Sequence, residues 1–329
     1  MATIDGLTLL TGGTGFLGGR LLERLAADGT PVRALVRRPL PPRLAGLVVE
    51  TWPGDLRDSR TLVGVCDGVD TVMHCAGLVT DYAPYRQFMD VNGTGTANLV
   101  EDASRAGVRR FIHVSTTDVY GYPSTPQPES APVRAAGFGY ADSKVSAEAV
   151  VRRAGRLGLA FTIVRPATIY GPRSETLVLQ IADLLKRGRM LLLDDGQQDA
   201  GLAYVDNVVD LLLTAAVSPR AVGETYNACD GDGVTWRRYC DRLAEVVGAP
   251  PCRTFLSFRL ARAVASIMER TSLLLGRRRR PLLTRTAVHI LGVPQRHQND
   301  KARRDLGWQP RVTFDAAFAE IREWLSRAP

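Results

Sequence analysis

The sequence predicts an α/β fold: a doubly wound parallel sheet followed by a smaller, mostly helical C-terminal region. Two observations lead to this fold class. In the first half of the 329-residue chain, apolar runs of strand length alternate with longer amphipathic runs of helix length, which is typical of a parallel sheet covered by helices on both faces. A glycine-rich turn at 11–18 lies between the first strand and the first helix, where glycine permits a tight connection.

Each predicted strand is a short apolar run bounded by turn residues, and each predicted helix repeats apolar residues every three or four positions. The strands lie at 7–10, 31–36, 46–51, 70–74, 110–114, 160–165 and 224–228. The helices lie at 17–26, 58–65, 85–106, 139–157, 175–187, 205–217, 235–247 and 255–275. Four prolines between 123 and 132 mark a long loop after the fifth strand.

Three glycines of the first turn, Gly12, Gly15 and Gly18, have separate predicted roles. Gly12 permits the tight turn, Gly15 lets the backbone approach a phosphate, and Gly18 lets the helix pack closely on the strand. Because a helix N-terminus attracts anions, the turn predicts a site for the pyrophosphate of a dinucleotide. The predicted cofactor contacts in this segment are Gly12, Thr14, Gly15, Phe16 and Leu17.

The end of the second strand predicts which nicotinamide cofactor binds. An acidic residue there binds the ribose 2′-hydroxyl of NAD, whereas a cationic residue binds the 2′-phosphate of NADP. Arg37 and Arg38 stand at this position and no acid does, so NADP(H) is favoured over NAD(H). The alternative is that both arginines simply face solvent. Further predicted cofactor contacts are Asp55 and Leu56 beside the adenine, and Cys75, Ala76 and Gly77 beside the cofactor backbone.

Tyr140 and Lys144 are four residues apart in a predicted helix and therefore share one face. A tyrosine titrates near 10, and an ammonium beside it favours the phenolate. Bringing that pKa near 7 takes roughly 4 kcal/mol, which the lysine and an oxidised nicotinamide can supply together. The hydroxyl of Thr116, at the end of the fifth strand, is predicted to orient a substrate oxygen, and Ser115 and Thr117 compete for this role.

Composition argues against several other classes of protein. The five cysteines and four histidines are scattered without ligand spacing, so neither a metal site nor a disulfide framework is predicted. The net charge of +8 comes without a nucleic-acid motif, and a solvated basic face is favoured over a nucleic-acid site. Because no leader-like or membrane-spanning run is present, we expect a cytoplasmic protein.

The apolar segment 255–275 also carries the charged residues Arg259, Arg262, Glu269 and Arg270. It is predicted to be an amphipathic helix that forms a lid over the substrate. A weak contact with a membrane surface is the alternative, to which the basic run Arg277–Arg280 could contribute.

The ligand crevice of a doubly wound sheet lies at the carboxyl ends of its strands. We expect residues 1–170 plus about 202–226 to form the cofactor-binding domain. We expect about 171–201 plus 227–329 to form the substrate-binding domain, because the strand–helix alternation loosens after Pro172.

These motifs together resemble the extended short-chain dehydrogenases/reductases, which have a Rossmann cofactor domain. The matching segments are 11–18, 54–56, 74–77, 115–121, Tyr140 with Lys144, 165–172, 204–208 and 301–310. The resemblance implies that Tyr140 is the acid–base, that Lys144 lowers its pKa and holds the nicotinamide ribose, and that Thr116 orients the substrate. It also implies that Pro166 and Thr168 line the nicotinamide and that the protein forms a homodimer.

Four segments distinguish the branches of this family. Where the dehydratases carry Thr-Asp-Glu, this chain has Thr116-Thr117-Asp118. Where sugar-nucleotide enzymes carry Arg-Asp-Phe, it has Ala200-Gly201-Leu202. Residues 204–208 and 281–285 resemble instead the 3β-hydroxysteroid dehydrogenase-like branch, which includes reductases of 2-alkyl-3-keto acids.

The resemblance therefore implies an NAD(P)H-dependent oxidoreductase that interconverts a ketone and a secondary alcohol. Its small-molecule substrate is expected to be mostly apolar, steroid-like or 3-keto acid-like. A sugar-nucleotide epimerase with transiently reduced bound NAD is the alternative of the same class. An NADP-sensing regulatory protein is the alternative of another class, disfavoured because Tyr140 and Lys144 are both present.

Overall fold

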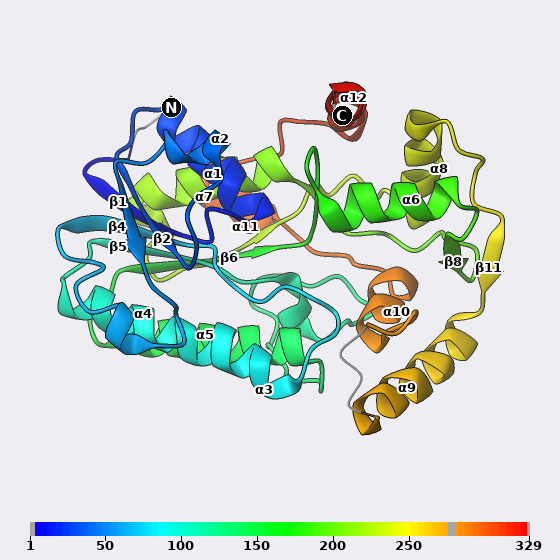
Figure 1. Cartoon of the computed structure of the whole chain (residues 1–329), viewed down its shortest axis with the longest axis horizontal. Helices are drawn as coiled ribbons and strands as arrows, with labels where there is room; N and C mark the ends of the chain where they lie inside the picture. Colours follow the sequence, from blue (N-terminus) through cyan, green and yellow to red (C-terminus); the bar gives the residue numbers. More distant parts are fainter. Residues whose placement is uncertain (1–3, 276–279, 328–329) are drawn as a thin grey trace.

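The computed structural model describes residues 4–275 and 280–327 and is built on one seven-stranded parallel sheet (Figure 1). The strands lie in the spatial order β3, β2, β1, β4, β5, β6, β10. They are β1 (Leu7–Thr11), β2 (Val32–Val36), β3 (Glu50–Pro53), β4 (Val69–His74), β5 (Arg110–Val114), β6 (Phe161–Pro166) and β10 (Thr225–Ala228). The chain direction across the sheet reverses between β1 and β4, which is where ligands of doubly wound sheets bind. The predicted fold class is confirmed.

Helices cover both faces of the sheet (Figure 1). One face carries α1 (Phe16–Ala27), α2 (Pro42–Ala45), α7 (Val205–Val217) and α11 (Asp300–Leu306), and the other carries α3 (Tyr85–Phe88), α4 (Gly95–Arg105) and α5 (Gly139–Arg156). Successive side chains of β1 point to opposite faces of the sheet. Leu10 packs in one core with Leu21 of α1, and Leu9 packs in another with Leu99 of α4.

A smaller, mostly helical region adjoins the sheet. It contains α6 (Ile181–Lys186), α8 (Trp236–Val247), α9 (Phe258–Leu274), α10 (Arg285–Gly292) and α12 (Phe314–Arg327), with the paired strands β8 (Leu191–Leu193) and β11 (Thr254–Leu256). A second parallel pair joins β7 (Thr168–Tyr170) to β9 (Leu202–Tyr204). The region has its own aromatic core, in which Tyr239 touches Tyr170, Trp236 and Phe318 edge to face.

Two elements of the cofactor half differ from the prediction. The third strand begins at Glu50 rather than at 46, because Leu47 and Val48 pack on the core instead of pairing with β2. The segment 58–65 is a 3₁₀ turn at Ser59–Thr61 rather than a helix. The Asp58 carboxylate accepts a hydrogen bond from the Arg60 backbone, a local bond that competes with regular helix.

Two predicted helices contain π-helical turns. The helix predicted at 85–106 passes through Met89–Thr94 between α3 and α4, and the one predicted at 175–187 begins with Glu175–Gln180 before α6. The three-residue strands β7, β8, β9 and β11 and the helices α10, α11 and α12 were not predicted. The apolar patterns of the four strands are too short to distinguish a strand from a loop.

Among the described residues, no helix is long and apolar enough to cross a bilayer. The amphipathic helix predicted at 255–275 is α9, preceded by β11. Of the basic run Arg277–Arg280, residues 277–279 lie outside the described residues. Arg280 forms an ion pair with Asp81, and its Nε donates to Asp81 Oδ1 at 2.7 Å.

Candidate functional site

The glycine turn between β1 and α1 has backbone geometry that only glycine satisfies. Gly12 has a φ of +76°, and a Cβ added there would lie 2.6 Å from the Ala76 nitrogen. A Cβ on Gly18 would lie 2.2 Å from the Gly12 carbonyl oxygen. Any side chain at either position would therefore force the turn open.

The N-terminus of α1 is suited to an anion. Gly15 precedes the helix without a side-chain hydrogen bond, and no acid lies in the first turn. Thr14 and Gly15 are exposed at the tip of the turn, and Phe16 and Leu17 behind them are half-buried. The first N–H groups of a helix have no partner within the helix and carry partial positive charge. The turn therefore fits the pyrophosphate of a dinucleotide.

The end of β4 connects this turn to the predicted catalytic lysine. Thr11 Oγ1 accepts a hydrogen bond from the Ala76 nitrogen at 3.1 Å. A Cβ on Gly77 would lie 3.5 Å from Lys144 Nζ and 3.1 Å from Asn92 Oδ1. Cys75, Ala76 and Gly77 are half-buried, so this segment borders both the turn and Lys144.

Arg37 and Arg38 follow β2 and are exposed. Within residues 4–275 and 280–327, neither guanidinium makes a hydrogen bond or an ion pair. The nearby Asp55 is occupied by Arg57, whose side-chain hydrogen bond, together with the charge of Arg37, lowers the pKa of that carboxyl. The two guanidiniums are thus available to a phosphate.

The remaining predicted cofactor contacts lie on separate elements. Leu56 is buried, and its carbonyl accepts from Asn98 Nδ2 at 2.7 Å. Pro166 is the buried last residue of β6, and the N–H of Thr168 donates to the Gly201 carbonyl at 2.8 Å.

Thr116, Tyr140 and Lys144 come together at the carboxyl end of β5. Lys144 is 4% exposed, and its Nζ donates to the carbonyl oxygen of Val114 at 2.7 Å. The Thr116 side chain lies beside the Tyr140 phenol. Burial lowers the pKa of Lys144 to about 8. Burial raises the pKa of Tyr140, and the charge of Asp118 raises it further, while Thr116 opposes them.

The two competing hydroxyls are placed differently. Ser115 Oγ donates to Glu148 Oε1 at 2.7 Å, so this hydroxyl is occupied away from the phenol. Thr117 is 4% exposed and opens a 3₁₀ turn. Of the three hydroxyls, that of Thr116 is the one that acts on the pKa of Tyr140.

Glu148 belongs to a buried network beneath the candidate site. Arg165 of β6 holds its carboxylate with two hydrogen bonds of 2.8 and 2.6 Å, and Arg165 Nη1 donates to Tyr120 Oη at 2.8 Å. Although burial opposes it, the Arg165 hydrogen bond lowers the pKa of Glu148. Glu148 is one turn beyond Lys144 on α5, so the network joins α5 to the strand end that carries Thr116.

Sequence reasoning missed an aromatic cluster beside Tyr140. Tyr122 has a φ of +59°, an uncommon conformation for a bulky residue. Its ring lies 5.1 Å from Phe138 and 5.7 Å from His289 of α10. Its buried hydroxyl lacks a hydrogen-bond partner, and burial and then the Asp118 carboxylate raise its pKa. No motif marks such a residue, because a distant helix completes the cluster.

Asp118 gives the site a pH-dependent contribution to stability. Burial raises the pKa of Asp118 to about 6, above the ordinary value near 4. The folded protein binds the Asp118 proton more tightly than the unfolded chain does. The stability that this proton contributes is complete below about pH 4 and is lost as the pH rises through about 6. As the pH rises from about 4 to about 6, the stability of Asp118→Asn, measured by urea unfolding, should increase relative to that of the native protein. Parallel pH profiles would contradict the assignment.

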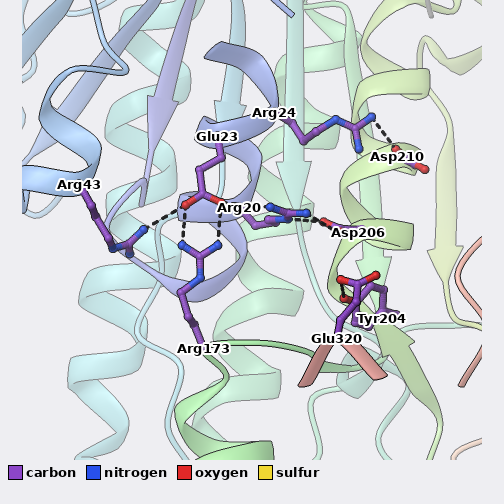
Figure 2. Close-up of polar contacts among 9 residues, drawn as sticks. All are labelled: Arg20, Glu23, Arg24, Arg43, Arg173, Tyr204, Asp206, Asp210 and Glu320. Atoms are coloured by element: carbon purple, nitrogen blue, oxygen red, sulfur yellow. Dashed lines mark hydrogen bonds and ion pairs between the residues drawn. The ribbon is translucent and has the colours of Figure 1, made fainter. Parts of the chain in front are cut away.

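Ion pairs attach α1 to other elements near the cofactor turn (Figure 2). Arg20 holds Asp206 of α7 through Nε and Nη2, the second at 2.8 Å. Glu23 accepts from both Arg173 nitrogens, at 2.5 and 2.6 Å, and from Arg43 at 3.2 Å. Arg173 has a φ of +72°. This network fixes α1 against α7 and against the chain that follows β7.

Known proteins resemble this chain along nearly its whole length. Residues 8–229 match the model of the NAD dependent epimerase/dehydratase family. A 2-alkyl-3-oxoalkanoate reductase of Stenotrophomonas maltophilia is 31% identical, covering 95% of this chain and 98% of its own. A 3 beta-hydroxysteroid dehydrogenase/Delta 5→4-isomerase of Mycobacterium tuberculosis is 30% identical, covering 97% and 90%. The structure of DesIV, a dTDP-glucose 4,6-dehydratase of Streptomyces venezuelae with NAD bound, has a TM-score of 0.79 and 25% identity, covering 97% of each chain.

Proposed function

Because the chain belongs to the NAD dependent epimerase/dehydratase family, we propose that it is an NADP(H)-dependent oxidoreductase that interconverts a ketone and a secondary alcohol. The observation that carries the proposal is the convergence of Thr116, Tyr140 and Lys144 next to Gly77 and the glycine turn. In the proposed arrangement, α1 and its glycine turn hold the pyrophosphate, and Lys144 holds the nicotinamide ribose. When bound, the cofactor supplies the hydride for the substrate carbonyl carbon.

The proposed proton chemistry uses this chain's own side chains. During reduction, Tyr140 donates its phenolic proton to the substrate oxygen, which becomes the hydroxyl of the product. Thr116 donates a second hydrogen bond to that oxygen and stabilises the developing negative charge. The phenolate left on Tyr140 is stabilised by the Lys144 ammonium. In the reverse direction the phenolate accepts the alcohol proton.

The proposed substrate is a small, mostly apolar ketone of the 3-keto acid or steroid type. The mostly buried aromatic cluster of Tyr122, Phe138 and His289 lies beside Tyr140 and makes that side of the candidate site largely apolar. Ala200 and Leu202 are buried in the core and bring no cation to a sugar-nucleotide diphosphate. The two relatives named above act, by their names, on a 3-oxoalkanoate and on a 3β-hydroxysteroid.

The substrate proposal is tested by following NADPH oxidation with 2-alkyl-3-keto acids, ketosteroids, aldehydes and UDP-sugars, and by repeating the screen with NADH. We expect net oxidation with one of the apolar ketone classes. The match to the NAD dependent epimerase/dehydratase family model favours a second candidate, a sugar-nucleotide epimerase that retains NAD. Epimerisation of a UDP-sugar without net cofactor consumption would select that candidate.

Replacing both guanidiniums after β2 should change the cofactor preference. Each charged hydrogen bond to a 2′-phosphate contributes about 1.5–3 kcal/mol, so Arg37→Ala with Arg38→Ala should raise the KM for NADPH by at least about tenfold. The KM for NADH should stay unchanged, as should both values in the control Arg60→Ala, whose arginine pairs with Asp58. A clear NADH preference in the native protein would contradict the proposal.

The proposal also includes expectations for the domain boundaries, the cellular compartment and the oligomeric state. The cofactor domain comprises 1–170 plus about 202–226, and the substrate domain comprises about 171–201 plus 227–329. The protein acts in the cytoplasm and forms a homodimer, in keeping with the family resemblance.

A further inference from the structure

The side of α9 that faces away from the protein is apolar. Leu260, Ile267 and Leu274 are 52%, 65% and 88% exposed. They are spaced by seven residues, which is close to two helical turns, so they form one stripe. On the opposite side, Ala261 and Ala265 are fully buried against β8 and α10. Figure 1 shows α9 at one end of the molecule, outside α10.

Exposed apolar side chains are concentrated in the part of the chain that contains this stripe. Thirteen large apolar side chains are exposed in the described part of the chain, and six of them lie between 255 and 282. Leu275 and Leu282, 60% and 74% exposed, extend the apolar character beyond the end of α9. Such a concentration marks an interaction site rather than a scatter of surface residues.

The exposed charges along the stripe are all positive. Arg259 and Arg270 are exposed on α9 and flank the stripe on one side by helical geometry. The one acid of α9, Glu269, is turned away and occupied by Arg285, whose Nε donates to Glu269 Oε2 at 2.9 Å. The outer face of α9, defined by Leu260, Ile267, Leu274 and these two arginines, therefore carries no acidic group.

We propose that the outer face of α9 docks on a membrane surface containing anionic lipid. An amphipathic helix with an exposed apolar stripe and flanking arginines lies in the interface, with its apolar side chains among the acyl chains. Guanidinium groups bind lipid phosphates with paired hydrogen bonds. A second copy of the chain is a poor occupant, because a symmetric contact would oppose arginines to arginines without an acid between them.

The proposal is tested by co-sedimentation of the full chain with vesicles. Phosphatidylcholine vesicles are compared with vesicles that also contain phosphatidylglycerol, each at low and high salt. We expect binding to the phosphatidylglycerol vesicles at low salt and a loss of most binding at high salt, because salt screens exposed charges. Failure to bind phosphatidylglycerol vesicles at low salt overturns the proposal.

Variants of the outer face of α9 test the contributions of its arginines and of its apolar side chains separately. Each of Arg259→Gln and Arg270→Gln should lower the partition coefficient by about fivefold. Ile267→Ser with Leu274→Ser should abolish binding. The matched controls, Arg60→Gln and Leu157→Ser, change side chains that are also strongly exposed but lie elsewhere, and should bind like the native protein. Thermal unfolding of each variant verifies that it is folded.

Two results would contradict the proposal even if some vesicle binding is seen. The first is equal binding by the native protein and the folded Ile267→Ser/Leu274→Ser variant, which would place the contact elsewhere. The second is a dimer in solution that this variant dissociates without any effect on vesicle binding, which would make the outer face of α9 a protein–protein interface.

Discussion

Tyr140→Phe is expected to lower kcat by about 10³-fold while leaving cofactor affinity nearly unchanged. The phenol lies beside Thr116 in the candidate site, and phenylalanine keeps the ring while removing the proton that the substrate oxygen must receive. The loss should appear in kcat, because proton donation acts in the transition state rather than in ground-state binding.

The measurement is a pair of titrations, cofactor binding by fluorescence and steady-state turnover, on the native and variant proteins. Tyr226→Phe is the matched control: its hydroxyl makes one long hydrogen bond, 3.4 Å to the Arg220 carbonyl, on strand β10. It should retain native turnover. If Tyr140→Phe turned over at the native rate, Tyr140 could not be the acid–base group.

Glu148→Leu is expected to lower the free energy of unfolding by about 3–5 kcal/mol. The substitution leaves the Arg165 guanidinium buried without its counter-charge, since both side chains are 2% exposed. It also removes the acceptor of the Ser115 hydroxyl. Because this network joins α5 to the end of β5, we expect kcat to fall as well, through misplacement of Lys144 and Thr116.

Urea unfolding measures this loss from the shift in midpoint at constant m-value. Glu323→Leu is the matched control, because Glu323 pairs with Arg327 on the exposed side of α12 and surface pairs contribute about 0–1 kcal/mol. A double variant, Glu148→Leu with Arg165→Met, should recover part of the lost stability, since no charge is then left unpaired. A loss below that of the surface control would show that the buried pair does not stabilise the fold.

The parts of the fold that follow local rules could be predicted from sequence. The strand at Arg110–Val114 and the helix at Val205–Val217 have the predicted bounds, because each is a complete apolar pattern between turn residues. Gly12 was singled out for the tight turn and Gly18 for close packing of the helix, and a Cβ at either one would clash with the backbone. These features depend on residues close in the chain.

Features that depend on distant partners could not be predicted. The π-helical turn at Met89–Thr94 lies where Gly95 packs against Leu56, a contact across 39 positions of sequence. Tyr122 meets His289, and Arg165 meets Glu148, only in the folded chain. No periodicity or spacing in the sequence marks such contacts, because they form only when distant segments pack against one another.

The most direct test of the account is isotopic. With a ketone substrate identified by the NADPH screen, the reaction is run with cofactor carrying deuterium at nicotinamide C4, and the released product is examined by mass spectrometry and NMR. We expect one deuterium at the carbinol carbon of the product, from one of the two labelled C4 positions, and one NADPH consumed for each alcohol formed. Two results would contradict the proposed hydride transfer. One is a product without deuterium when either of the two C4 hydrogens of NADPH is labelled, and the other is turnover without net consumption of NADPH.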